Sequence, residues 1–232
     1  MKPSRLLAVA QTPAGERMTL STHSGRYTVR VEGHVLMCSS AHHSEERMAE
    51  IACRGPDARV LVAGLGLGYT LRAALDRLGP AGRVVVAELM PAVVEWNRGP
   101  LADVAGRPLD DPRVRVVAGD VVELLAAAPE PFDGILLDVD NGPGAFPVDT
   151  NERLSGHDGL RLLRAALRPG GSVVVWSAFP SRAFPGRLRS AGFDARSVQV
   201  RARGDRGPRH WLYVGERRES RAARSRRGGG AA

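Results

Sequence analysis

The stretch that decides the fold is residues 60–75, which read VLVAGLGLGYTLRAAL. Four apolar residues are followed by three glycines at alternate positions, and then by a segment with the apolar spacing of a helix. A continuous apolar run is typical of a strand buried on both faces, and glycines allow the chain to turn sharply into a helix. The segment therefore predicts a strand, a glycine-rich turn and a helix, which is the basic unit of an α/β fold.

The same alternation continues toward the C-terminus. Further apolar runs predict strands at residues 84–87, 114–118, 134–137 and 172–176, and helices are expected at 69–78, 91–98, 121–127, 159–167 and 185–191. Residues 195–203 and 210–216 follow with only a short turn between them, which predicts an antiparallel hairpin. We therefore expect an α/β fold with a doubly wound, mostly parallel, seven-stranded sheet of Rossmann-like type.

The N-terminal region has a different pattern. Residues 17–40 predict two or three short strands joined by glycine turns, and Ser44 is expected to cap a helix that runs to about Cys53. We predict three parts: a β segment with its helix over residues 1–55, an α/β domain over 56–216, and a disordered basic tail over 217–232.

Composition narrows the class of protein. The net charge is +8, and residues 216–232 contribute half of it, since six arginines and two glutamates give +4. Nucleic acid is therefore expected as a partner only through this tail. No apolar run reaches the roughly 18 residues of a membrane span, and the N-terminal apolar stretch is too short for a signal peptide, so we expect a cytoplasmic protein. Two cysteines and six histidines indicate no metal site. The adjacent His42 and His43 are expected to point apart, and His210 is expected to be a surface residue of a strand.

Three carboxylates follow three of the predicted strands. Glu88 ends its strand 24 positions after Gly64, and Asp120 and Asp138 end the next two strands. Ligands bind at the carboxyl ends of parallel strands, and an acid about 20 residues after a glycine turn can reach ribose hydroxyls. We expect Gly64, Gly66, Gly68, Glu88, Asp120 and Val121 to hold a nucleoside.

Other interpretations of these residues remain open. Asp120 could simply cap the next helix, Glu88 could lie on the surface, and Asp138 could belong to a turn stabilised by Asp and Asn side chains. A dinucleotide fingerprint would need a glycine where Tyr69 stands, and a phosphate loop would need a lysine that the segment lacks. These two classes of nucleotide site are excluded.

The motifs resemble those of the spermidine synthases, the polyamine aminopropyltransferases with a class I S-adenosylmethionine-binding fold, from about Tyr27 to Val214. Residues 64–72, GLGLGYTLR, align without a gap with the family's GGGDGGxLR. The resemblance implies that Glu88 binds the ribose and Asp120 the adenine amino group. Residues 138–143, DVDNGP, correspond to a family loop two residues longer, in which Asp138 matches the catalytic aspartate and Asp140 approximately the second acid.

The sequence departs from the family in the half that binds amines. Leu67 stands where the family has the aspartate that holds the donor's amine, and residues 44–46, Ser-Glu-Glu, replace a motif with a channel tyrosine. A family Leu-Tyr pair is matched by Leu154 and Ser155. Glu45 and Glu46 are expected as substitute substrate-binding carboxylates. Removing the partner of a buried charge typically costs roughly 3–5 kcal/mol, so these changes bear on the choice of substrate.

Three functions remain open at this point. The first is transfer of an aminopropyl group from decarboxylated S-adenosylmethionine to an amine, with Asp138 and Asp140 as catalytic acids and with a homodimer as an implied assembly. The second is methyl transfer from intact S-adenosylmethionine, which Leu67 suits, with Trp176, Phe179 and Phe146 as walls of an acceptor pocket. The third is a non-catalytic nucleoside-binding or RNA-associated protein that uses its arginine tail.

Overall fold

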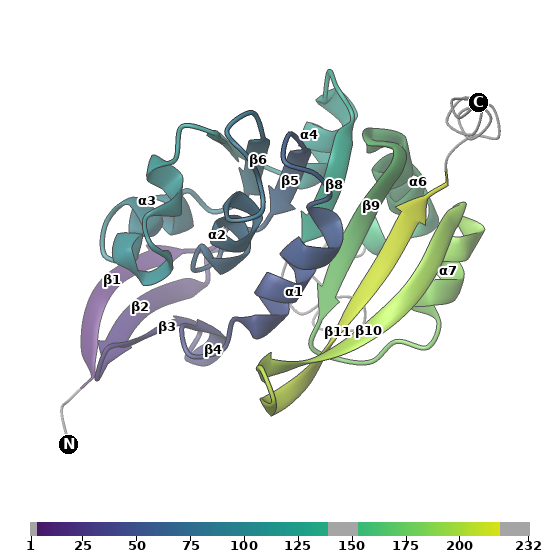
Figure 1. Ribbon diagram of the computed structural model, residues 1–232. Helices are drawn as coiled ribbons and strands as arrows, with labels where there is room; N and C mark the ends of the chain where they lie inside the picture. The colour runs from purple at the N-terminus through teal and green to yellow at the C-terminus, as the bar shows by residue number, and fades with distance from the viewer. Residues whose placement is uncertain (1–3, 139–152, 219–232) are drawn as a thin grey trace, which may run out of the picture.

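A computed structural model of the chain describes residues 4–138 and 153–218 (Figure 1). The predictions that fall on Asp140, on Phe146 and on the tail beyond residue 218 lie outside these residues. The described chain forms two sheets, one antiparallel with four strands and one mostly parallel with seven.

The larger sheet confirms the predicted α/β architecture. Its strand order is β10-β11-β9-β8-β5-β6-β7, in which β5 to β9 are mutually parallel and β11 runs antiparallel to both β9 and β10. The strands are β5 (Arg59–Ala63), β6 (Arg83–Glu88), β7 (Val114–Ala118), β8 (Phe132–Leu137), β9 (Leu167–Ser177), β10 (Phe193–Arg203) and β11 (Arg206–Arg217).

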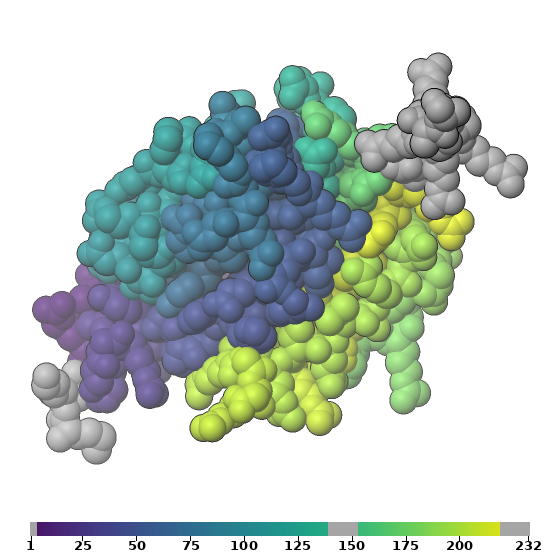
Figure 2. All heavy atoms as spheres, in the orientation of Figure 1, coloured from purple at the N-terminus to yellow at the C-terminus, as the bar shows by residue number. Residues whose placement is uncertain are grey.

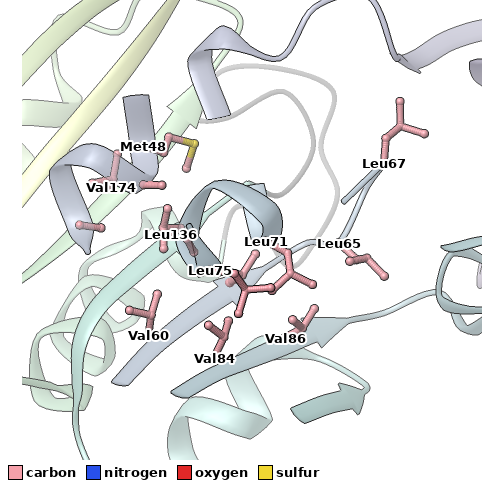
Figure 3. Close-up of a cluster of buried hydrophobic side chains, with 14 of the residues drawn as sticks. Met48, Val60, Leu65, Leu67, Leu71, Leu75, Val84, Val86, Leu136 and Val174 are labelled. Carbon is pink, nitrogen blue, oxygen red and sulfur yellow. The ribbon is translucent and has the colours of Figure 1, made fainter. Parts of the chain in front are cut away.

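Helices cover both faces of this sheet. They are α1 (His43–Ala52), α2 (Tyr69–Leu75), α3 (Pro91–Arg98), α4 (Val121–Ala127), α6 (His157–Ala166) and α7 (Phe184–Ser190), with 3₁₀ turns at Ala102–Ala105 and Pro108–Asp110. Side chains of α1, α2 and α3 belong to one buried cluster, and those of α4, α6 and α7 belong to the other. Successive strand residues alternate between the two clusters, as the pleat of a sheet requires. Part of the first cluster is shown in Figure 3, which labels Met48, Val60, Leu71, Leu75, Val84, Val86, Leu136 and Val174.

The smaller sheet is an antiparallel meander with strand order β1-β2-β3-β4. Its strands are β1 (Arg5–Gln11), β2 (Arg17–His23), β3 (Arg26–Val31) and β4 (His34–Cys38). Met18, Leu20 and Val29 are fully buried in the same cluster as α1 and α2, so this sheet packs onto the α/β core. The strand β1 was not predicted, because Leu6 and Val9 are more than half exposed and the segment lacks a clear inside and outside.

The start of α1 also differs from the prediction. The helix begins at His43, with His42 as the preceding cap residue, and no side chain caps its first turn. Ser44 lies within the helix and is 1% exposed, so the prediction of a serine cap was wrong. Its hydroxyl instead bonds to side chains of the pocket described below. None of the helices in the described part of the chain is long and apolar enough to cross a membrane.

Candidate functional site

The glycine turn between β5 and α2 has the backbone conformation that its sequence predicts. Gly64, Gly66 and Gly68 have φ angles of +89°, +52° and +87°, which residues with a side chain rarely adopt. A Cβ atom at Gly68 would also lie 3.1 Å from the Asn97 side-chain oxygen and 3.2 Å from Pro108. Both backbone conformation and space therefore require glycine at position 68.

Two buried polar side chains hold the turn from the neighbouring elements. The carboxylate of Glu88, at the end of β6, accepts hydrogen bonds from the backbone N–H of Leu65 at 2.8 Å and of Met90 at 2.9 Å. The amide of Asn97, on α3, donates to the carbonyl of Gly66 at 2.9 Å. Glu88 is 7% exposed, so its interpretation as a surface residue was wrong. Asn97 was missed, although a polar residue on the apolar face of a helix is a usable signal.

Asp120 caps the helix that follows it. One carboxylate oxygen accepts from the backbone N–H of Val122 at 2.8 Å, and the other pairs with Arg153 at 2.9 Å. The local capping role that the sequence allowed is therefore present, and it leaves lone pairs on both oxygens. Val121 is buried at the start of α4.

A pocket of about 230 Å³ lies beside the glycine turn. It is enclosed by residues of β4, α1, the turn, α2 and the ends of β8, β9 and β11. The residues that line it are Val35, Leu36, Met37, Cys38, Ala41, Glu45, Leu65, Gly66, Leu67, Tyr69, Thr70, Asp138, Trp176 and His210. The structure thus brings Gly66, Asp138 and Glu45 together, whereas Glu88, Asp120 and Glu46 are not among the lining residues.

The tip of the β10–β11 hairpin helps to close this region. Arg203 of β10 donates to the Ser40 hydroxyl at 3.2 Å, in the segment that joins the small sheet to α1. Figure 2 shows the hairpin next to α1 and the adjoining end of the small sheet on this face of the molecule. The pocket is therefore built from segments that are far apart in the sequence.

Asp138 lies directly after β8, as the sequence predicts. Its backbone N–H donates to the carbonyl of Ala63 on the neighbouring strand at 2.9 Å. The hydroxyl of Thr70, on α2, donates to a carboxylate oxygen of Asp138 at 2.5 Å. A hydroxyl that donates to an ionised carboxylate fixes its orientation. Asp138 is therefore held at the wall of the pocket by both the sheet and α2.

Glu45 is the second acid of the pocket. The Ser44 hydroxyl donates to one of its carboxylate oxygens at 2.6 Å. Burial and the nearby charge of Asp138 raise the pKa of Glu45 to about 8, although the Ser44 hydrogen bond acts in the opposite direction. No arginine or lysine forms an ion pair with Glu45 within the described residues. Glu45 therefore lies in an environment that disfavours its negative charge.

Glu46, the other predicted substitute acid, is on the outside of α1. The Nδ1 atoms of His42 and His43 lie 2.9 and 3.3 Å from its two carboxylate oxygens. The expectation that these adjacent histidines point apart was therefore wrong. His42 also stacks on Tyr69, with 4.3 Å between the ring centroids.

The remaining polar residues of the pocket were not predicted as a group. Trp176 Nε1 donates to the Ser44 hydroxyl at 3.1 Å, and His210 Nδ1 lies 3.0 Å from the same oxygen. His210 was predicted to be a surface strand residue, but it lines the pocket, and burial lowers its pKa. Nothing local in the sequence signals this cluster, because its members come from α1, β9 and β11.

Two other predicted residues are placed clearly. Leu67 is 6% exposed and lines the pocket as an apolar wall. Phe179 is 55% exposed and is not among the lining residues. Within the described residues, no group of three or more His, Cys, Asp or Glu side chains could hold a metal ion.

The fold is shared with known structures of two kinds. A spermidine synthase in complex with the transition-state analogue AdoDATO superposes with a TM-score of 0.76 at 19% identity, over 93% of this chain and 75% of that one. The O-methyltransferase TomG from Streptomyces achromogenes, in complex with SAM, gives 0.51 at 19% identity, over 75% and 79%. These similarities define the class, an α/β protein with the fold of spermidine synthases and class I methyltransferases.

The curated relatives are polyamine aminopropyltransferases. Polyamine aminopropyltransferase 2 of Streptomyces coelicolor is 33% identical over 195 residues, which are 80% of this chain and 34% of the relative. The Mycobacterium tuberculosis polyamine aminopropyltransferase is 37% identical over 124 residues, 52% of this chain and 23% of that protein. No family model matches. The chain is therefore a divergent relative of the polyamine aminopropyltransferases, and it spans about a quarter to a third of the length of these two proteins.

Proposed function

We propose that this chain is an aminopropyltransferase, which takes an aminopropyl group from decarboxylated S-adenosylmethionine and passes it to a small amine. The observation that carries the proposal is the pair of carboxyl groups, Asp138 and Glu45, in one small pocket beside the glycine turn. Two acids in a confined pocket favour cationic ligands, and both reactants of this transfer carry ammonium groups. The named relatives and the spermidine synthase structure support the same activity.

The residues around the glycine turn would each bind a different part of the donor's adenosine. Gly64, Gly66 and Gly68 would let the adenosine approach the backbone, Glu88 would accept from the ribose hydroxyls, and Asp120 would accept from the adenine amino group. Each carboxylate oxygen of Asp120 accepts one hydrogen bond and has a further lone pair that a ligand could use. Asp120 would therefore combine its capping role with ligand binding, with Val121 beside it.

The reaction requires a free amine. Asp138 would take a proton from the acceptor's ammonium, and the amine would then attack the carbon next to the sulfonium. A new N–C bond forms as the S–C bond breaks, and its electron pair stays on sulfur, which leaves neutral methylthioadenosine. Holding donor and acceptor in line is the rest of the catalytic task. Asp140 remains a proposed second acid.

The test is to incubate the purified chain with decarboxylated S-adenosylmethionine and either 1,4-diaminobutane or 1,5-diaminopentane. Mass spectrometry should detect methylthioadenosine and an amine that is heavier by one aminopropyl group. A parallel reaction with intact S-adenosylmethionine examines methyl transfer, which Leu67 keeps open. Production of S-adenosylhomocysteine with no methylthioadenosine would contradict the proposal.

Assembly, domain organisation and location remain predictions. We propose a homodimer, which sedimentation of the purified chain would test, with residues 1–55, 56–216 and 217–232 as its three parts. A cytoplasmic location is expected on the same footing. An RNA contact is proposed only for the arginine-rich tail.

A further inference from the structure

A hydrogen-bonded cluster lies next to Glu45, centred on a residue that replaces part of a family motif. Its centre is Ser44, which is 1% exposed and is 132 residues away from Trp176 and 166 away from His210. The ring of His210 also packs edge-on against that of Trp176, with 4.7 Å between centroids. A single buried hydroxyl therefore gathers three partners from three elements of the fold.

The chemistry of these partners fixes the direction of each hydrogen bond. The Trp176 N–H can only donate, and the Ser44 hydroxyl has one proton, which goes to Glu45. His210 must then donate from Nδ1–H to the remaining lone pair of the serine oxygen. Burial lowers the pKa of His210, which favours the neutral ring, and the hydrogen-bond assignment places the ring's one N–H proton on Nδ1. The Ser44 hydroxyl is then fully hydrogen-bonded: Trp176 and His210 donate to its oxygen, and its own proton points to Glu45.

This arrangement has a consequence for Glu45. A satisfied network holds a side chain in one orientation. Within the described residues, Ser44 is the side chain that donates to the Glu45 carboxylate. Glu45 borders the same pocket as Leu67, Gly66 and Asp138. Leu67 forms an uncharged wall of the pocket. Among the described residues that line the pocket, Glu45 and Asp138 carry the carboxyl groups, so Glu45 can bind a cation where Leu67 cannot.

We infer that Glu45, oriented by Ser44, Trp176 and His210, is the residue that binds the terminal ammonium of the donor's aminopropyl chain. The inference rests on the proposed function and assigns donor selection to one residue. An ammonium would favour the ionised form of Glu45, which burial and the charge of Asp138 otherwise disfavour. A donor that keeps its carboxylate would instead bring a further negative charge next to Asp138 and Glu45, so the intact donor should be rejected.

The test measures binding, so it does not depend on turnover. Calorimetry should give dissociation constants of decarboxylated and intact S-adenosylmethionine for the unmodified chain, for E45Q and for the control E50Q. Glu50 lies on the same helix and pairs with Arg77 at 2.9 Å. E45Q should reduce the preference for the decarboxylated donor by roughly 10- to 100-fold, mostly by weakening that donor, whereas E50Q should leave the preference unchanged.

A second pair of variants tests the orienting network. H210N keeps a donor where Nδ1–H was and should retain most of the preference, whereas H210F should lose about 3- to 10-fold of it. Thermal unfolding should show both to be folded, and this pair decides the question if E45Q does not fold. Equal preferences in H210N and H210F would overturn the role of His210.

The outcomes separate the two claims. If neither donor binds the unmodified chain, the proposed function fails. If the decarboxylated donor binds more tightly but E45Q keeps the full preference, only the assignment of Glu45 fails.

Discussion

The two halves of the pocket region are built in different ways. The glycine turn depends on backbone conformation and on Glu88 and Asn97, which lie within about 35 residues of Gly64 in the sequence. The acidic half brings together Glu45, Trp176 and His210 from distant parts of the chain. A site built from neighbouring residues can be recognised in the sequence of a divergent protein. A network whose residues are distant in the sequence leaves no local pattern there. Breaking each half should therefore have different consequences.

The largest expected effect comes from the acid next to both halves. D138N should lower kcat by roughly 10²- to 10⁴-fold, since it removes the proposed base and keeps the shape of the side chain. Binding of methylthioadenosine should change by less than about threefold, because this product has no ammonium to pair. Rates of methylthioadenosine formation and calorimetry give the two quantities. The control D76N alters an exposed carboxylate that pairs with Arg72, and a similar loss of kcat in that variant would contradict the role of Asp138.

A smaller but still large effect is expected on the glycine turn. G68A should destabilise the chain by about 1–3 kcal/mol, because position 68 has a positive φ angle and its Cβ would press on Asn97 and Pro108. The control G186A lies in α7, where a Cβ meets nothing within 4 Å, and it should stabilise the helix by roughly 0.5–1 kcal/mol. Urea unfolding measures both changes. Opposite signs for the two glycines are the expected result.

The next largest effect is expected from the hydrogen bonds that Glu88 accepts. E88Q turns an acceptor of two backbone N–H groups into a side chain that presents its own N–H₂ to one of them. We expect a loss of about 1–2 kcal/mol in the free energy of unfolding and weaker binding of methylthioadenosine. E95Q, an exposed glutamate on α3, is the matched control. If E88Q bound methylthioadenosine as tightly as the unmodified chain, Glu88 would have a structural role only.

The smallest effect concerns the charge of Glu45. Its pKa is about 8 in the folded chain against an ordinary value of 4.5, so folding favours the protonated form. The contribution of Glu45 protonation to the free energy of unfolding is fully present below about pH 4.5 and is lost as the pH rises toward 8. E45Q cannot ionise, so it should gain about 1 kcal/mol over the unmodified chain between about pH 5 and pH 9, a value reduced for contact with water.

The same measurement must take account of the neighbours of Glu45. The titratable groups that face it among the described residues are Asp138 after β8, Tyr69 on α2, His210 on β11, Cys38 on β4 and Glu46 on α1. Unfolding of E45Q and of E50Q in urea at both pH values isolates the part that belongs to Glu45. A pH profile of E45Q parallel to that of the unmodified chain would show that another of these groups carries the dependence.

Much of the fold could be predicted because its signals are local. The apolar runs of β5 and β8, the glycines of the turn and the carboxylates that end the strands all lie in short segments with clear periodicity. The strand β1 could not be predicted, since two of its five apolar residues, Leu6 and Val9, face solvent. The serine at position 44 looked like a helix cap from its neighbours, and only the approach of β9 and β11 explains why its hydroxyl is turned inward.

The measurement that tests the central claim most directly is a side-by-side calorimetric titration of the unmodified chain with decarboxylated S-adenosylmethionine, intact S-adenosylmethionine and methylthioadenosine. The account predicts that all three bind through the glycine turn and that the decarboxylated donor binds most tightly, by about 10-fold or more over the intact one. Equal or tighter binding of the intact donor would contradict the claim that Glu45 and Asp138 form a pocket for an ammonium group. That result would favour methyl transfer as the function.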